Sequence, residues 1–123
     1  MKILKKATNI EFTPAIDEYL AKHLIAHIER LVDTKDESAT VALEVGKTSR
    51  HHNKGDVFRA EVNLHISGSN LRAEAERDDL HMAIDEVREE IVRELTKNKK
   101  RRFDLLKRGG QKLKDLMRGI SGN

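Results

Sequence analysis

The stretch FRAEVNLHISGSNLRAEAE, residues 58–76, decides the fold. Apolar and polar residues alternate through residues 58–66 and again through 71–76, and this two-residue period predicts two strands that each bury one face. The segment Ser67-Gly68-Ser69-Asn70 between them is typical of a tight turn. The stretch therefore predicts an antiparallel hairpin with one apolar face. The face predicted to meet water carries Arg59, Glu61, Asn63, His65, Arg72 and Glu74.

Two further strands are predicted on the N-terminal side of this hairpin. Residues 40–45 alternate in the same way, and residues 2–8 begin with the apolar pair Ile3-Leu4. A polar loop, residues 49–56, separates the strand at 40–45 from the hairpin. The chain thus supplies four strands.

Two amphipathic helices are predicted as well. The first begins after Thr13, a residue that can cap a helix, and has Pro14 at its first position. It is expected to end near Asp33. Its apolar stripe is Ile16, Leu20, Leu24, Ile28 and Leu31. The second begins at Asp78 or Asp79, either of which can cap it. Its apolar stripe is Leu80, Ile84, Val87, Ile91 and Leu95.

The element order is therefore β-α-β-β-β-α. The apolar face of the sheet and the apolar stripes of the two helices must be buried, and packing them against each other achieves this. The predicted fold class is α+β, a two-layer sandwich in which a four-stranded sheet has both helices packed on one face. We expect residues 1–102 to form this domain and residues 103–123 to form a basic C-terminal tail. Within the tail, residues 111–118 suffice for two helical turns, which are marginal in isolation.

The composition excludes several classes of protein. The 123 residues correspond to one domain, and the absence of cysteine excludes disulfides, cysteine-based zinc sites and thiol nucleophiles. No apolar run approaches 18 residues and the N-terminus lacks a hydrophobic stretch, so neither a membrane span nor a signal peptide is expected. These features fit a cytoplasmic protein.

The charge is unevenly distributed along the chain. Residues 97–123 contain ten Lys and Arg against Asp104 and Asp115, a net of +8, whereas residues 1–96 have a net charge of −5. A basic arm on an acidic body indicates a polyanionic partner, with nucleic acid as the first candidate. A solubilising tail is the alternative, with equal weight.

Basic residues also follow one side of the second predicted helix. Arg93, Lys97 and Lys100 are separated by steps of four and three, with Arg101 beside them, on the side opposite the apolar stripe. One or two cations would be enough to complement the helix dipole, but residues 97–102 contain five. This crowding favours binding of a phosphate backbone. The lack of neighbouring aromatic residues argues against a single-strand binder that stacks bases.

The histidines support no catalytic or metal site. His23 and His27 are four residues apart, but two ligands fall short of the three that a catalytic zinc requires. No nucleophile, orienting acid or phosphate-binding glycine loop is recognisable, so we expect no enzyme activity and no cofactor.

The polar loop at 49–56 holds a second group of histidines and cations. It is interpreted either as a solvated loop tip or as a loop that contacts phosphates. The residues of this possible RNA-contacting loop are Arg50, His51, His52 and Lys54.

Three segments resemble one known family. They are NIEFTPA at 9–15, EVNLHISG followed by LRAEA at 61–75, and DLHMAID at 79–85. In this order and spacing they resemble the ribosome hibernation-promoting factor and ribosome-associated translation inhibitor family over roughly residues 1–101. The resemblance implies the fold β-α-β-β-β-α, the order already obtained from periodicity.

The resemblance also implies a function without catalysis. It implies binding to the small ribosomal subunit, in the channel for mRNA and tRNA, and a halt of translation in stressed or resting cells. The partners implied are ribosomal RNA and neighbouring ribosomal proteins, with no membrane and no small-molecule substrate. The family motif places basic contacts at Arg93, Lys97 and Lys99, whereas Glu90, His81 and Asn98 depart from it. The full set of expected RNA-binding residues is Lys22, Arg93, Lys97, Lys99, Lys100, Arg101 and Arg102.

Two other functions stay open at this point. One is a small RNA-binding or RNA-chaperone module that is not dedicated to ribosomes, and the other is a histidine-dependent hydrolase. The residues after 102 are too few for the second domain of long family members, so a short form with a basic extension is expected. We expect this extension to be mobile in the free protein and ordered when bound.

Overall fold

The computed structural model describes the backbone of residues 1–49 and 55–121, and the side chains of residues 1–48 and 55–110. It confirms the predicted order of strands and helices, since α1, η1 and α2 follow one another without a break. The elements are β1 (Lys2–Thr8), α1 (Pro14–Leu20), the π-helical segment η1 (Ala21–Ile25), α2 (Ala26–Glu29), β2 (Thr40–Ser49), β3 (Asp56–Ile66), β4 (Ser69–Arg77) and α3 (Leu80–Ser121).

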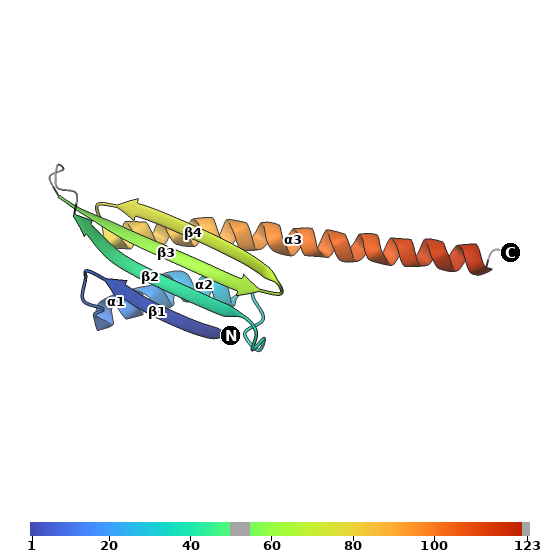
Figure 1. Ribbon diagram of the computed structural model, residues 1–123, viewed down its shortest axis with the longest axis horizontal. Helices are drawn as coiled ribbons and strands as arrows, with labels where there is room; N and C mark the ends of the chain where they lie inside the picture. Colours follow the sequence, from blue (N-terminus) through green and yellow to red (C-terminus); the bar gives the residue numbers. More distant parts are fainter. Residues whose placement is uncertain (50–54, 122–123) are drawn as a thin grey trace.

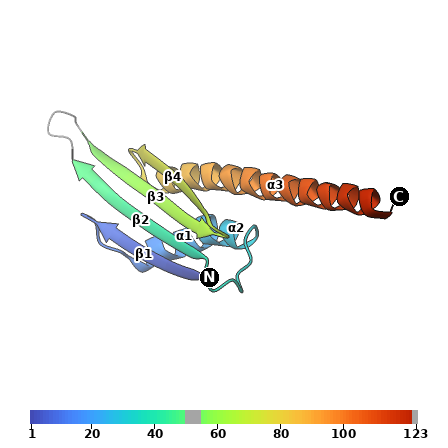
Figure 2. The ribbon, with the colours of Figure 1, turned by 45° about the vertical axis from the view of Figure 1, so that its right-hand side comes forward.

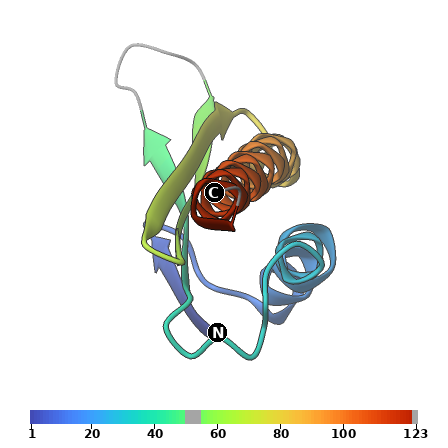
Figure 3. The ribbon, with the colours of Figure 1, turned by 90° about the vertical axis from the view of Figure 1, so that its right-hand side faces the viewer.

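The four strands form one mixed sheet in the order β1-β2-β3-β4. β1 runs parallel to β2, whereas β2, β3 and β4 are antiparallel to one another. The helical segment α1–α2 is the crossover that a parallel pair requires. Figure 3 shows both helices on the same face of the sheet, as the two-layer sandwich predicts.

The β3–β4 hairpin is tighter than the sequence suggested. Ile66 pairs with Ser69, so only Ser67 and Gly68 form the turn, and Ser69 and Asn70 belong to β4. Both turn residues have a positive φ, 46° and 78°. This is the type I′ geometry that matches the twist of the strands it joins.

The core lies between the sheet and the helices. The apolar positions of β2 and β3, such as Val41 and Leu64, alternate inward as predicted. They meet the stripe of α3 represented by Ile84 and Ile91, and α3 also contacts η1 and α2. The remaining large side chains that are fully buried are Leu20, Leu24, Ile28, Val45, Val62, Val87 and Leu95.

The first helix begins as predicted and ends earlier. The Thr13 hydroxyl accepts the N–H of Ile16 at 3.2 Å, and Pro14 is the first helical residue. The last helical residue is Glu29, four residues before the expected end at Asp33. The Asp33 carboxylate accepts the N–H of Lys35 at 3.0 Å, and such a side-chain turn competes with continued helix.

The second helix is longer than predicted. Asp79 accepts the N–H of Met82 at 3.2 Å and caps the start of α3. The helix then continues without interruption to Ser121, through Gly109 and Gly110. Two glycines cost about 1 kcal/mol each in a helix, which weakens it without breaking it. Figures 1 and 2 show α3 projecting well past the end of the sheet.

The projecting part carries apolar side chains in solvent. Phe103, Leu105 and Leu106 are all exposed, with 66%, 58% and 75% of their surface accessible. Within the described part of the chain, no helix combines the length and the hydropathy needed to cross a membrane.

Candidate nucleic-acid interface

The basic stripe of α3 lies in solvent. Arg93, Lys97, Lys100 and Arg101 are exposed, on the side away from the buried stripe of the helix. Lys97 is near Glu94, at 3.9 Å. Among the described residues, the other three have no ion-pair partner. We call these four residues the outer stripe; their charges are available to an anion.

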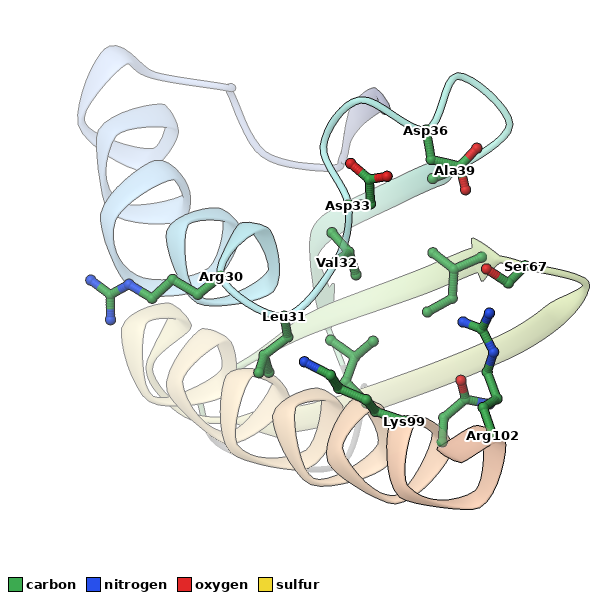
Figure 4. A pocket seen from close by; sticks show the side chains of 12 residues that line it. Arg30, Leu31, Val32, Asp33, Asp36, Ala39, Ser67, Lys99 and Arg102 are labelled. Atoms are coloured by element: carbon green, nitrogen blue, oxygen red, sulfur yellow. The ribbon is translucent and has the colours of Figure 1, made fainter. Parts of the chain in front are cut away.

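Two other predicted cations, Lys99 and Arg102, lie on a different side of the same helix. They line a pocket of about 480 Å³ between α3, the segment after α2 and the β3–β4 turn. In Figure 4 Lys99 extends toward Leu31 and Arg102 extends toward Ser67. The structure therefore divides the predicted basic cluster into the outer stripe and a pocket pair.

Sequence reasoning missed a third cation at this pocket. Arg30 follows the last residue of α2 and lies at the pocket edge, where Figure 4 shows its side chain pointing away from the cavity. A basic residue at the end of a predicted helix was the available signal, but the helix was expected to extend past it.

The pocket lining combines an apolar wall with polar and charged side chains, and its rim carries two carboxylates. Asn98 is buried, with 8% of its surface exposed, and its amide donates to the Ser69 hydroxyl at 3.1 Å. On the rim, the Ser38 hydroxyl and N–H hold the pKa of Asp36 below its ordinary value, with a smaller contribution from Arg102. The wall consists of Leu31, Val32, Ala39, Ile66 and Leu95.

Lys22 does not belong to either group on α3. It lies on η1, is exposed, and forms an ion pair with Glu18 at 2.8 Å. Its charge is therefore partly compensated before any ligand arrives. The loop residues Arg50, His51, His52 and Lys54 lie outside the described residues.

An aromatic stack that was not predicted joins the two helices. The ring of Tyr19 lies between those of His23 and His81, with both centroid distances 4.1 Å. Its hydroxyl donates to Asp85 at 2.8 Å, and burial followed by this bond raises the pKa of Tyr19. Arg88 also contacts Asp85, at 3.2 Å. His23 is thus engaged in stacking, and the described residues include no cluster of three or more potential metal ligands.

His27 faces a positive environment beside this stack. Burial lowers its pKa, and the charges of Arg30, Arg88 and His23 lower it further.

The open face of the sheet is balanced by its own ion pairs. Arg59 contacts Glu61, Glu74 and Glu44, and Arg72 contacts Glu61 and Glu74. Hydrogen bonds from Asn63 and Arg72, together with Arg59, lower the pKa of Glu61 although burial acts in the opposite direction. This face meets water as predicted, and its two arginines are already paired with carboxylates. The helix side is the better candidate for binding a polyanion.

One protein family matches most of this chain. A sequence model of the family described as "Sigma 54 modulation protein / S30EA ribosomal protein" matches residues 5–102. The chain belongs to this family. The resemblance noted in the sequence is thereby confirmed, and the S30EA match ends where the exposed extension of α3 begins.

Curated relatives of this S30EA protein are named ribosome hibernation promoting or promotion factors. The ribosome hibernation promoting factor of Klebsiella oxytoca is 30% identical over 91 residues, 74% of this chain and 85% of the relative. That of Escherichia coli (strain K12) is 28% identical over 99 residues, 80% and 94% of the two chains. The ribosome hibernation promotion factor of Picosynechococcus sp. is 29% identical over 106 residues, 84% of this chain. The aligned region spans about half, 51%, of that last relative.

Solved structures share the fold of this S30EA protein. The N-terminal domain of Protein Y from Thermus thermophilus aligns with a TM-score of 0.60 at 23% identity, covering 79% of this chain and 98% of that one. A ribosomal subunit interface protein from Coxiella burnetii aligns with a TM-score of 0.61 at 22% identity, covering 80% and 98%. The α+β sandwich is therefore a known fold.

Proposed function

We propose that this protein binds the small ribosomal subunit in the channel used by mRNA and tRNA and blocks translation in stressed or resting cells. Membership of the S30EA family supports this, as do relatives named ribosome hibernation promoting factor. The role is binding rather than catalysis, and its setting is the cytoplasm. The partners proposed are ribosomal RNA and the ribosomal proteins that border the channel.

The observation that carries the proposal is the outer stripe. Its four cations lie in solvent on one side of α3, and three of them have no ion-pair partner among the described residues. Phosphate groups neutralise such cations and release condensed counterions, which favours binding. The open sheet face cannot do this equally well, because Arg59 and Arg72 already contact carboxylates.

The other predicted site residues have subordinate roles in this proposal. Lys22 would exchange Glu18 for a phosphate, which gains less than an unpaired cation does. Lys99 and Arg102 would contact RNA from the pocket side of α3. Contacts from Arg50, His51, His52 and Lys54 stay a prediction of the sequence.

Sedimentation through a sucrose gradient tests the proposal. Wild-type protein mixed with ribosomes and with separated subunits should migrate with the small subunit and inhibit a reconstituted translation reaction. The variant Lys97→Glu/Lys100→Glu should remain at the top of the gradient. The matched control Lys2→Glu/Lys6→Glu changes the same charge on exposed residues of β1 and should still migrate with the small subunit. Recovery of the wild type only at the top would overturn the proposal.

A general RNA-binding or RNA-chaperone module is the second candidate. The outer stripe favours it because phosphate contacts carry no sequence information. Excess unrelated RNA in the gradient sample separates the two functions. It would remove a general RNA binder from the small subunit, whereas a dedicated ribosome factor would stay bound.

A further inference from the structure

We infer that the pocket beside the β3–β4 turn receives one unstacked nucleotide of the bound RNA. Lys99 and Arg102 would hold its phosphate, and the apolar wall would hold its base. The inference rests on the proposed function and deepens it, because it adds a site that reads a base to a surface that contacts phosphates.

The first argument is the position of the two cations. Lys99 and Arg102 line the pocket, and no salt bridge joins either to another described residue, although the charge of Arg102 acts on Asp36 across the rim. Their sequence neighbours Lys100 and Arg101 belong to the outer stripe. A strand bound along the outer stripe therefore passes within one helical turn of the pocket, and one nucleotide can leave the strand and enter it.

The second argument is the size and the wall of the pocket. Its volume of about 480 Å³ falls in the range of small-ligand sites. Leu31 and Val32 are half-buried and give the wall an apolar surface at the entrance.

The third argument is the acidic rim, which determines how a nucleotide would be oriented in the pocket. Asp33 and Asp36 each use one carboxylate oxygen to bond the backbone of the 33–38 segment. Their other oxygens can accept N–H groups from a base. Carboxylates repel phosphate, so the phosphate belongs beside Lys99 and Arg102 and the base beside the acids. A base with an amino group suits this rim.

The test compares a short oligoadenylate with a ribose-phosphate oligomer of the same length that lacks bases. Wild-type protein should bind the oligoadenylate about tenfold more tightly, the scale of one well-held base. Val32→Phe fills the pocket without changing charge and should bring the two affinities close to equal. Lys99→Gln/Arg102→Gln should do the same. The matched pair Lys100→Gln/Arg101→Gln removes equal charge outside the pocket, so it should weaken both oligomers and preserve their ratio.

Several results would overturn the inference. One is equal wild-type affinity for the two oligomers, and another is a ratio that survives both pocket variants while circular dichroism shows them folded. Tighter binding of free adenosine monophosphate than of the oligomer would assign the pocket to a small ligand instead. Failure of the proposed function looks different, because the wild type would then not migrate with small subunits at all. Migration with subunits together with an affinity ratio of one removes only the nucleotide pocket.

Discussion

Tyr19 on α1 and Asp85 on α3 are joined by a hydrogen bond in which the phenol donates to both carboxylate oxygens, at 2.8 and 3.0 Å. The two residues are 66 positions apart in the chain. The bond lies at the edge of the core, where the two helices meet, and the rings of His23 and His81 cover both sides of the phenol. It therefore adds a polar link between the helices that the buried core already packs together.

Removing this bond should weaken the protein modestly. We expect Tyr19→Phe to lower the free energy of unfolding by about 1 kcal/mol, since the ring stacking remains and one hydrogen bond to a carboxylate is lost. Urea denaturation measures the change. In an Asp85→Asn background the same substitution should cost less, and an unchanged cost in that background would show that the bond does not couple the helices.

Truncation of a core side chain should lower the free energy of unfolding by a larger amount. Ile84 has none of its surface exposed, so Ile84→Ala should lower the free energy of unfolding by about 2–5 kcal/mol through lost packing and a residual cavity. Met82 lies two residues away with 54% of its surface exposed, and Met82→Ala is the matched control that should change little. Similar losses in the two variants would contradict the register of α3.

The salt dependence of binding tests the outer stripe directly. Affinity for small subunits should fall steeply between about 50 and 300 mM salt, because each neutralised phosphate releases counterions. Lys97→Glu/Lys100→Glu should weaken binding and flatten that slope, with the thermal melting temperature unchanged. A slope that is the same in this variant and in Lys2→Glu/Lys6→Glu would remove the stripe from the mechanism.

His27 should make stability depend on pH. Burial, followed by the charges of Arg30 and Arg88, lowers its pKa in the folded protein from 6.5. The unfolded chain therefore binds more protons than the folded protein once the pH drops below about 6.5. The free energy of unfolding falls as the pH falls from the pKa of His27 in the unfolded chain through its lower pKa in the folded protein. His27→Gln removes this contribution, so its unfolding free energy should fall less between about pH 7.5 and about pH 5.5. Equal losses for variant and wild type would show that His27 titrates normally.

The extension of α3 should affect the residence time of the protein on the small subunit rather than the stability of its fold. Phe103, Leu105 and Leu106 are exposed, so deletion of residues 103–123 should leave the unfolding free energy of the domain unchanged. If the extension contacts the ribosome, deletion should speed dissociation more than it slows association. Stopped-flow or filter-binding measurements with labelled small subunits give both rates, and an unchanged off-rate would make the extension dispensable for binding.

Most of the fold could be predicted because its signals are local. Strict alternation identified β2, β3 and β4, and the stripe through Ile84 and Ile91 identified the buried side of α3. The early end of the first helix coincides with a side-chain turn at Asp33, which a periodicity of apolar residues does not register. The parallel pairing of β1 with β2 depends on how the crossover packs, which is a tertiary property.

The candidate site could be predicted in composition but not in arrangement. The cluster at 97–102 was found by counting charges, and helical spacing correctly placed Lys97 and Lys100 in solvent. The same spacing puts Lys99 and Arg102 on the side facing the β3–β4 turn, but a pocket exists there only because the 31–39 segment closes it. The stack of His23, Tyr19 and His81 needs two helices brought together, so no spacing within one helix could reveal it.

The unbroken continuation of α3 gives this small protein an arm of set direction. Residues 103–121 rise about 28 Å along the helix axis, roughly the width of a small domain. Each residue added or removed within the arm shifts everything beyond it by about 1.5 Å and turns it by about 100°. Inserting one residue into this segment would therefore rotate the side chains beyond it to another side of the helix axis. Inserting seven residues, close to two full turns, would move them outward along the axis and leave them on nearly the same side.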